Sequence, residues 1–126
     1  MGRQAIVFSK SLGEMASALN SNLTAAEKLN CLVQIASRAL GVRGCSLMLL
    51  DAKRKKLIHV ATHGLSDRYV KAGGVEADRS LPEIMEGRTA VVVDVAGDPR
   101  LQFADVARQE RIASIIGVPV VCRGKI

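Results

Sequence analysis

Two apolar segments separated by a short charged segment predict a β-hairpin in the middle of the chain. Residues 47–50 are all apolar, which is typical of a strand covered on both faces. Residues 51–56, Asp-Ala-Lys-Arg-Lys-Lys, are too polar to be buried and predict the turn. Residues 57–63 then alternate, with Ile58, Val60 and Thr62 on one face, and Gly64 ends this strand. A lone hairpin is only marginally stable, so we expect further strands and covering helices.

An amphipathic helix is predicted before the hairpin, within residues 1–23. Ser11-Leu-Gly-Glu14 fits a capping box, with Ser11 as the N-cap and Glu14 reaching back to it. The apolar residues at helical spacing are Leu12, Met15, Ala16, Leu19 and Leu23. Such a stripe is compatible with a helix packed on its own domain and equally with a dimerisation or signal-transmitting helix.

A second helix is predicted between residues 24 and 40. Thr24-Ala-Ala-Glu27 is another capping box, and Gly41 is a natural helix stop. The apolar stripe between these ends consists of Leu29, Leu32, Val33, Ala36 and Leu40. We therefore expect this helix to lead directly into the central hairpin.

The second half of the chain alternates short helices and strands. Ser66 and Asp67 predict a helix to about Ala72, which Gly73-Gly74 breaks. Further helices are predicted from Ser80-Leu-Pro-Glu83, with Pro82 in the first turn, to Gly87, and over residues 105–111. Strands are predicted over residues 90–95 and 113–121, with turns at residues 97–100 and at Arg123-Gly124. The last turn is followed by Lys125-Ile126, which resembles the start of a returning strand, so we expect that the chain is truncated.

Composition narrows the class of protein. A chain of 126 residues with 48% hydrophobic residues predicts one domain with a real core. The net charge of +6 favours an acidic partner, but the longest basic run is only residues 53–56. One Tyr and two Phe offer little surface for stacking on bases, so we do not expect nucleic-acid binding.

The three cysteines, Cys31, Cys45 and Cys122, have no paired spacing with one another or with histidine. This argues against a disulfide framework and against structural zinc, and it fits a reducing compartment. The apolar run of residues 5–8 is too short for a signal peptide or a membrane span. We therefore expect a cytoplasmic protein with no membrane partner, and no metal site.

The ordered set of elements and motifs resembles the GAF domain, a family of small-molecule sensory modules in signalling proteins. The segments that carry the resemblance are Leu40-Gly-Val42, Cys45 to Asp51, Leu57, Ala61-Thr-His-Gly-Leu65, Val93-Asp94, Asp98-Pro-Arg100, and Ser114 to Val120 followed by Gly124. The resemblance covers about residues 23–126. It places the GAF domain at residues 24–126, without its C-terminal strand, after the helix of residues 1–23.

The resemblance implies an α+β, profilin-like fold, with an antiparallel sheet of about five to six strands between helical layers. It implies a sensory module that binds a small ligand, forms a homodimer through the N-terminal helix, and relays a signal to an output domain in cis or in trans. An ordinary GAF module is not an enzyme. The Asn-Lys-Phe-Asp-Glu set of cyclic-nucleotide-binding members is not present, and no cysteine is followed by His as in bilin-binding members. The ligand and any cofactor therefore stay unidentified.

Candidate pocket residues lie between the hairpin and the Val-Pro-Val strand. They are Tyr69, Ser80, Ile84, Asp94, Arg100 and Phe103. Apolar residues with a few placed polar groups are typical of a small-molecule pocket, and also of a second core with its rim. Arg100 could bind an anionic ligand, but we favour a structural role in which Asp98 caps its own turn and Arg100 pairs with a carboxylate such as Asp94.

Three other features allow two interpretations each. His59 and His63 lie on one strand face too far apart to share a metal ion, so ordinary hydrogen bonding is favoured. Cys45 and Cys122 invite comparison with free methionine sulfoxide reductases, a GAF family with catalytic cysteines, although only Arg123 lies beside Cys122. The basic residues 53–56 form a solvated hairpin tip or contact an acidic partner.

A ligand-free scaffold for dimerisation is the main alternative to the sensor, and a cysteine-dependent enzyme is the third hypothesis.

Overall fold

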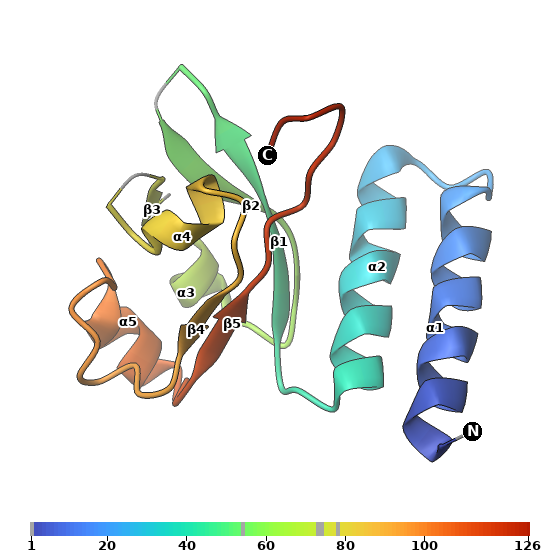
Figure 1. Cartoon of the computed structure of the whole chain (residues 1–126), viewed down its shortest axis with the longest axis horizontal. Helices are drawn as coiled ribbons and strands as arrows, with labels where there is room; N and C mark the ends of the chain where they lie inside the picture. Colours follow the sequence, from blue (N-terminus) through green and yellow to red (C-terminus); the bar gives the residue numbers. More distant parts are fainter. Residues whose placement is uncertain (1, 54, 73–74, 78) are drawn as a thin grey trace. The chain divides into compact units, whose positions relative to one another are not determined.

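The computed structural model describes residues 2–53, 55–72, 75–77 and 79–126 (Figure 1). The elements are α1 (Arg3–Leu19), α2 (Ala25–Leu40), β1 (Cys45–Asp51), β2 (Lys56–His63), α3 (Asp67–Val70), β3 (Val75–Glu76), α4 (Pro82–Met85), β4 (Ala90–Val92), α5 (Ala104–Gln109) and β5 (Ile115–Gly117). The strands form two sheets, β1-β2-β3 and β4-β5, and the pairs β2-β3 and β4-β5 are antiparallel. The fold is therefore α+β, as the sequence predicts.

The chain divides into two compact units, and each is described by itself. The first comprises Met1–Met48 and His59–Leu65, and the second comprises Leu49–Ile58 and Ser66–Ile126. The first unit thus holds both long helices and the base of the hairpin. The second holds the hairpin tip and all the short elements.

Helices α1 and α2 run antiparallel, side by side, in the first unit (Figure 1). The prediction that Ser11 caps α1 is wrong, because the helix begins at Arg3 and Ser11 is a buried residue in its interior. Glu14 does not reach back to Ser11 but forms an ion pair with Arg38 of α2. Ser11 and Glu14 match the sequence pattern of a capping box, but Glu14 contacts another helix instead. The pattern therefore does not mark a helix start here.

Helix α2 has both of the predicted ends. The Thr24 hydroxyl accepts a hydrogen bond from the Glu27 amide at 3.2 Å, and the Thr24 amide donates to the Glu27 carboxylate at 2.9 Å. Gly41 adopts the left-handed conformation, with φ of 64°, that ends many helices. Inside the helix Val33 and Ile35 are buried, and they contribute the apolar core of this unit.

The predicted hairpin is present as β1 and β2. Along β2 the side chains of Leu57, His59 and Ala61 are more buried than those of Ile58 and Val60, which confirms the predicted alternation. Gly64 ends the strand in the left-handed conformation, with φ of 73°. Strand β3, which pairs with the start of β2, was not predicted because two residues are too few to show a period.

The second unit is built around Val92 and Val95, which are fully buried, and Ala107. The partly buried residues packed against them are Tyr69, Leu81, Leu101, Ile112 and Ile115. Strand β4 pairs with β5 so that Ala90 faces Gly117 and Val92 faces Ile115. Both strands are shorter than predicted, and Pro119, which lacks an amide hydrogen, lies two residues after the end of β5.

The short helices are confirmed with small corrections. Ser66 caps α3, because its hydroxyl accepts a hydrogen bond from the Tyr69 amide at 3.3 Å, and Pro82 opens α4 as predicted. The residue before Pro82 is Leu81, in the left-handed conformation with φ of 52°, so Ser80 is not the cap. The break at Gly73-Gly74 lies outside the described residues. The predicted turn at Arg123-Gly124 is present, bridged by Cys122 and Lys125.

Candidate functional site

Arg100 is the centre of a charged cluster in the second unit. Its guanidinium donates to the Asp98 carboxylate, at 2.6 Å from Nη2 to Oδ2, and to Glu83 Oε1 at 2.8 Å. It also donates to the carbonyl of Val91 at 2.8 Å. The Asp98 carboxylate accepts a hydrogen bond from the Arg100 amide at 2.9 Å and so caps its own turn, as predicted. The partners of Arg100 are therefore Asp98 and Glu83, not Asp94 as the sequence suggested.

The ionisation of this cluster follows from its hydrogen bonds. The Arg100 guanidinium holds the pKa of Asp98 down at about 2, and both carboxylates raise the pKa of Arg100. The pKa of Glu83 is lowered by a hydrogen bond from its own backbone amide and then by Arg100. Within the described part of the chain, Glu83 Oε2 is buried without a hydrogen-bond partner. Because Arg100 is already bound to two carboxylates, its geometry favours a structural role.

Tyr69 belongs to the packed centre of the second unit and contacts the cluster of Val92, Val95 and Ala107. Burial raises the pKa of Tyr69, and the nearby Glu110 carboxylate raises it further. The same Glu110 carboxylate accepts hydrogen bonds from the amide and the hydroxyl of Ser66, at the start of α3. The position of Tyr69 is thus fixed from two sides.

The other sequence-predicted site residues are dispersed. Ser80 is buried, with 4% of its surface exposed, whereas Phe103 is 37% exposed. Asp94 is exposed, and its carboxylate accepts a hydrogen bond from the amide of Ala96 at 3.2 Å. A ligand-binding role for Tyr69, Ser80, Asp94, Arg100 and Phe103 stays a prediction.

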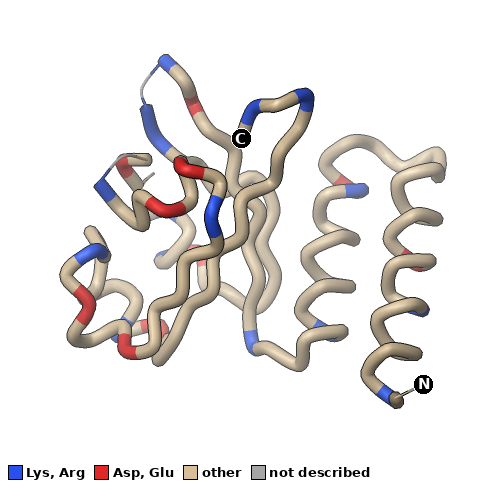
Figure 2. Tube along the Cα trace, viewed as in Figure 1, with Lys and Arg blue, Asp and Glu red and all other residues tan. Residues whose placement is uncertain are grey.

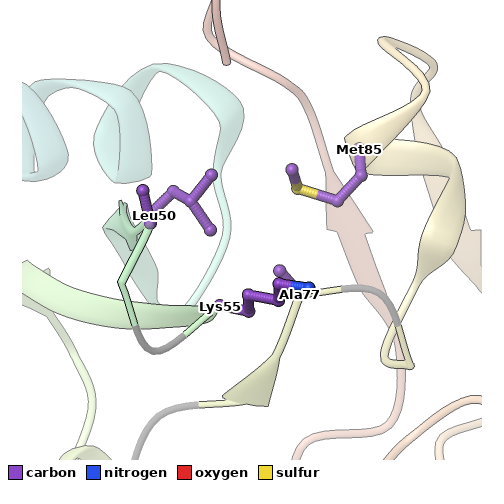
Figure 3. A pocket seen from close by; sticks show the side chains of 5 residues that line it. Leu50, Lys55, Ala77 and Met85 are labelled. Atoms are coloured by element: carbon purple, nitrogen blue, oxygen red, sulfur yellow. The ribbon is translucent and has the colours of Figure 1, made fainter.

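The second unit contains a pocket of about 290 Å³, partly open to solvent (Figure 3). It is lined by Leu50, Ala52, Lys55, Ala77 and Met85. Figure 3 shows the side chains of Leu50 and Met85 pointing toward one another, with Lys55 extending beside Ala77. The Ala77 amide donates a hydrogen bond to the Lys55 carbonyl at 2.9 Å, which joins two walls of the pocket. None of the sequence-predicted site residues lines it.

The pocket escapes sequence reasoning because its lining comes from three separate segments. Leu50 lies next to the last residue of β1, Ala52 and Lys55 belong to the hairpin turn, and Ala77 and Met85 follow in a loop and a short helix. Each of these residues has an ordinary structural explanation where it stands. The sequence feature that could have pointed to the pocket is the group of lysines at the hairpin tip. Figure 2 shows them as basic positions on both sides of the turn.

The histidines and cysteines are the other residues to which the sequence gives a chemical interpretation. His59 Nδ1 lies 2.5 Å from the Ser46 hydroxyl, and burial lowers the pKa of His59. Burial raises the pKa of the Cys45 thiol, which opposes formation of a reactive thiolate there. Cys122 is exposed. Among the described residues, no three His, Cys, Asp or Glu side chains gather in a way that could hold a metal ion.

Helix length and hydropathy bear on membrane insertion. Across residues 2–53, 55–72, 75–77 and 79–126, every helix is too short or too polar to cross a bilayer.

Comparison with known proteins identifies the family. The fold defines the class of the protein as a small α+β domain with antiparallel sheets and a partly apolar pocket. The family model of the GAF domain matches residues 25–126, so the chain belongs to the GAF domain family. No curated protein matches the sequence of this chain.

Solved structures agree on the fold. The GAF domain of a phosphoenolpyruvate-protein phosphotransferase from Coxiella burnetii has a TM-score of 0.80 and 18% identity, over 98% of this chain and 74% of that one. The corresponding Acinetobacter domain has a TM-score of 0.73 and 20% identity, over 99% and 72%. Free methionine-R-sulfoxide reductase from Neisseria meningitidis, solved with its substrate, has a TM-score of 0.75 and 17% identity, over 99% and 71%. At these identities the likeness concerns the fold alone.

Proposed function

We propose that this chain is a sensory, regulatory module that binds a small cytosolic molecule and relays the binding event to an output domain. The observation that carries the proposal is the pocket of about 290 Å³, four of whose five lining residues are apolar. Small-molecule sites are mostly apolar concavities of about 300–1,000 Å³ with a few placed polar groups. The pocket volume is close to the lower limit of this range and suits a small ligand. The GAF family supplies the sensory context.

The proposed dimer forms through α1. Phe8, Leu12 and Leu19 are 42%, 67% and 49% exposed, although all three are large and apolar. Spacings of four and seven residues place them within about 40° of one another on the helix. The buried Ser11, and Glu14 with its ion pair to Arg38, lie on the side that packs against α2. The exposed stripe is therefore free to meet the same stripe of a second copy in a homodimer.

The relay would be a shift between two conformations of the dimer. A ligand changes their populations only to the extent that it binds one more tightly than the other. The pocket walls include the hairpin turn and α4, so a ligand between Leu50 and Met85 can favour one spacing of these two segments. The output domain, in cis or in trans, would respond to that difference.

Native mass spectrometry of the chain purified from the cytoplasm tests the proposal. We expect a dimer that carries additional mass, which leaves on denaturation. Ala52→Phe should remove the additional mass and leave the dimer, because Ala52 is an exposed turn residue whose enlargement fills the pocket. A dimer without additional mass, which also fails to bind any added small molecule at the pocket, would favour the ligand-free scaffold.

A cysteine-dependent sulfoxide reductase is the second candidate, because one structural neighbour is a free methionine-R-sulfoxide reductase. The raised pKa of Cys45 opposes it, and Cys122, which is exposed, is the better nucleophile of the two. We expect no reduction of free methionine sulfoxide above the level of a Cys122→Ser variant. If the unsubstituted chain reduces methionine sulfoxide and Cys122→Ser abolishes this activity, the enzyme hypothesis would replace the sensor hypothesis.

A further inference from the structure

The pocket combines an apolar lining with one positive charge. Leu50, Ala52, Ala77 and Met85 provide aliphatic or thioether surface, and Lys55 is the one charged side chain among the five. Methionine adapts its shape to irregular ligands, so Met85 can close on an aliphatic chain of variable form. An occupant that matches both features has an apolar body and an anionic group.

The Lys55 ammonium is available to such a group. Within the part of the chain that the structure describes, no carboxylate forms an ion pair with Lys55. The acid closest in sequence is Asp51, whose carboxylate accepts the amide of Lys53 at 3.1 Å. Lys53 and Lys56 are exposed on the same hairpin and add to its positive potential.

We propose that the pocket takes a small amphipathic anion, with its aliphatic chain between Leu50 and Met85 and its carboxylate on the Lys55 ammonium. This inference rests on the proposed function, because it names the chemical class of the ligand for the same pocket. The volume of about 290 Å³ suits a short chain rather than a nucleotide or a tetrapyrrole. Lys55 thus determines the charge of the ligand, and Met85 contacts its apolar body.

Hexanoate and hexanamide are the probes that test it, because they have the same shape and differ in charge. The chain has four methionines, so methyl-labelled methionine gives a simple spectrum in which Met85 reports on the pocket. Met15, on α1, is not among the lining residues and serves as the internal control, whereas Met48 is two residues from Leu50 on β1 and is not used as one. A Met85→Leu variant assigns the signal, since this exchange preserves volume.

We expect both probes to shift the Met85 signal and hexanoate to bind about two- to fivefold more tightly than hexanamide, which is the range for exposed ion pairs. Rising salt should reduce the preference. Lys55→Gln should abolish it. The variant leaves the strained left-handed backbone at this position, with φ of 53°, unchanged, because both side chains have the same branching at Cβ. Lys53→Gln is the matched control, since it removes the same charge from the same hairpin outside the pocket lining, and it should keep the preference.

The outcomes separate this inference from the proposed function. Equal binding of the two probes would overturn the anion preference and leave a functioning pocket. A preference lost equally in Lys53→Gln and Lys55→Gln would show a diffuse charge effect and overturn the assignment to Lys55. If neither probe shifts Met85, or if Met15 shifts as much as Met85, the pocket does not bind such ligands, and the proposed function loses its supporting observation as well.

Discussion

The Glu110 carboxylate binds Ser66 twice, with Oε1 at 2.6 Å from the amide nitrogen and Oε2 at 2.5 Å from the hydroxyl oxygen. The two residues are 44 positions apart, and the contact joins the end of α5 to the start of α3. Ser66 in turn caps α3 by accepting the Tyr69 amide. One carboxylate therefore fixes the position of a helix start and, through it, of Tyr69.

Replacement of Glu110 should destabilise the protein. Hydrogen bonds to charged groups contribute about 1.5–3 kcal/mol each, and solvent exposure reduces this, so we expect Glu110→Ala to cost about 1–2 kcal/mol. Glu110→Gln keeps one acceptor oxygen and should cost less. Chemical denaturation measures both. Equal stability of Glu110→Ala and the unsubstituted protein would show that Ser66 holds its position without the carboxylate.

Tyr69 should ionise at unusually high pH. Burial raises its pKa above the ordinary value of about 10, and Glu110 adds repulsion. Tyr69 is the one tyrosine and there is no tryptophan, so the absorbance of tyrosinate reports on this residue alone. Because the folded protein holds the protonated form, stability is retained below about pH 10 and is lost as the pH rises through the pKa of the folded protein. Glu110→Gln should lower the pKa of Tyr69, yet leave it above 10, since burial is the larger cause.

Two glycines with similar backbone conformations offer a matched test of close packing. Gly41 and Gly64 have φ of 64° and 73°, so alanine at either position costs about 1 kcal/mol through the backbone alone. A Cβ at Gly41 would meet no atom within 4 Å, whereas a Cβ at Gly64 would lie 2.0 Å from the carbonyl oxygen of Arg43. Gly64→Ala must therefore displace the backbone, which adds about 1–3 kcal/mol. Thermal or chemical unfolding that gave the two variants equal stabilities would contradict this close approach.

Local signals made some of the structure predictable from sequence. Both ends of α2 follow from Thr24, Glu27 and Gly41, because each interaction there spans only a few residues. Ser11 and Glu14 form the same pattern, but the partner that decides its meaning is Arg38, on another helix. A sequence pattern cannot distinguish these two cases without knowing what packs against it.

The charged cluster and the pocket show the same limit. Sequence reasoning identified the Asp98 turn, since Asp98 and Arg100 are two residues apart, but not the more distant Glu83. The pocket joins Leu50, Ala77 and Met85 through tertiary contacts alone. Its lining therefore follows from the fold rather than from any one motif.

The Asp98 cluster predicts a loss of stability in acid. Arg100 lowers the pKa of Asp98 from its ordinary value of about 3.9 to about 2. Because the folded protein holds the carboxylate, this contribution is complete above about pH 4 and is lost as the pH falls toward 2. Asp98→Asn should flatten the fall of the unfolding temperature in this window, and a residual slope should remain because the pKa of Glu83 is also lowered. An unchanged slope in Asp98→Asn would place the acid sensitivity elsewhere.

The exposed stripe of α1 predicts where a dimer can be broken. Leu12 is the most exposed of its apolar residues, so Leu12→Glu should leave the folded monomer intact. In the dimer the new carboxylate must be desolvated, and we expect the dissociation constant to rise at least about tenfold. Ile6→Glu is the control, because Ile6 is also exposed at 58% but lies about 120° around the helix from Leu12. Sedimentation should therefore find dimers for the unsubstituted chain and Ile6→Glu, and monomers for Leu12→Glu at the same concentration. A dimer that Ile6→Glu breaks and Leu12→Glu does not would place the interface on the other side of α1, and a monomeric unsubstituted chain would remove this contact altogether.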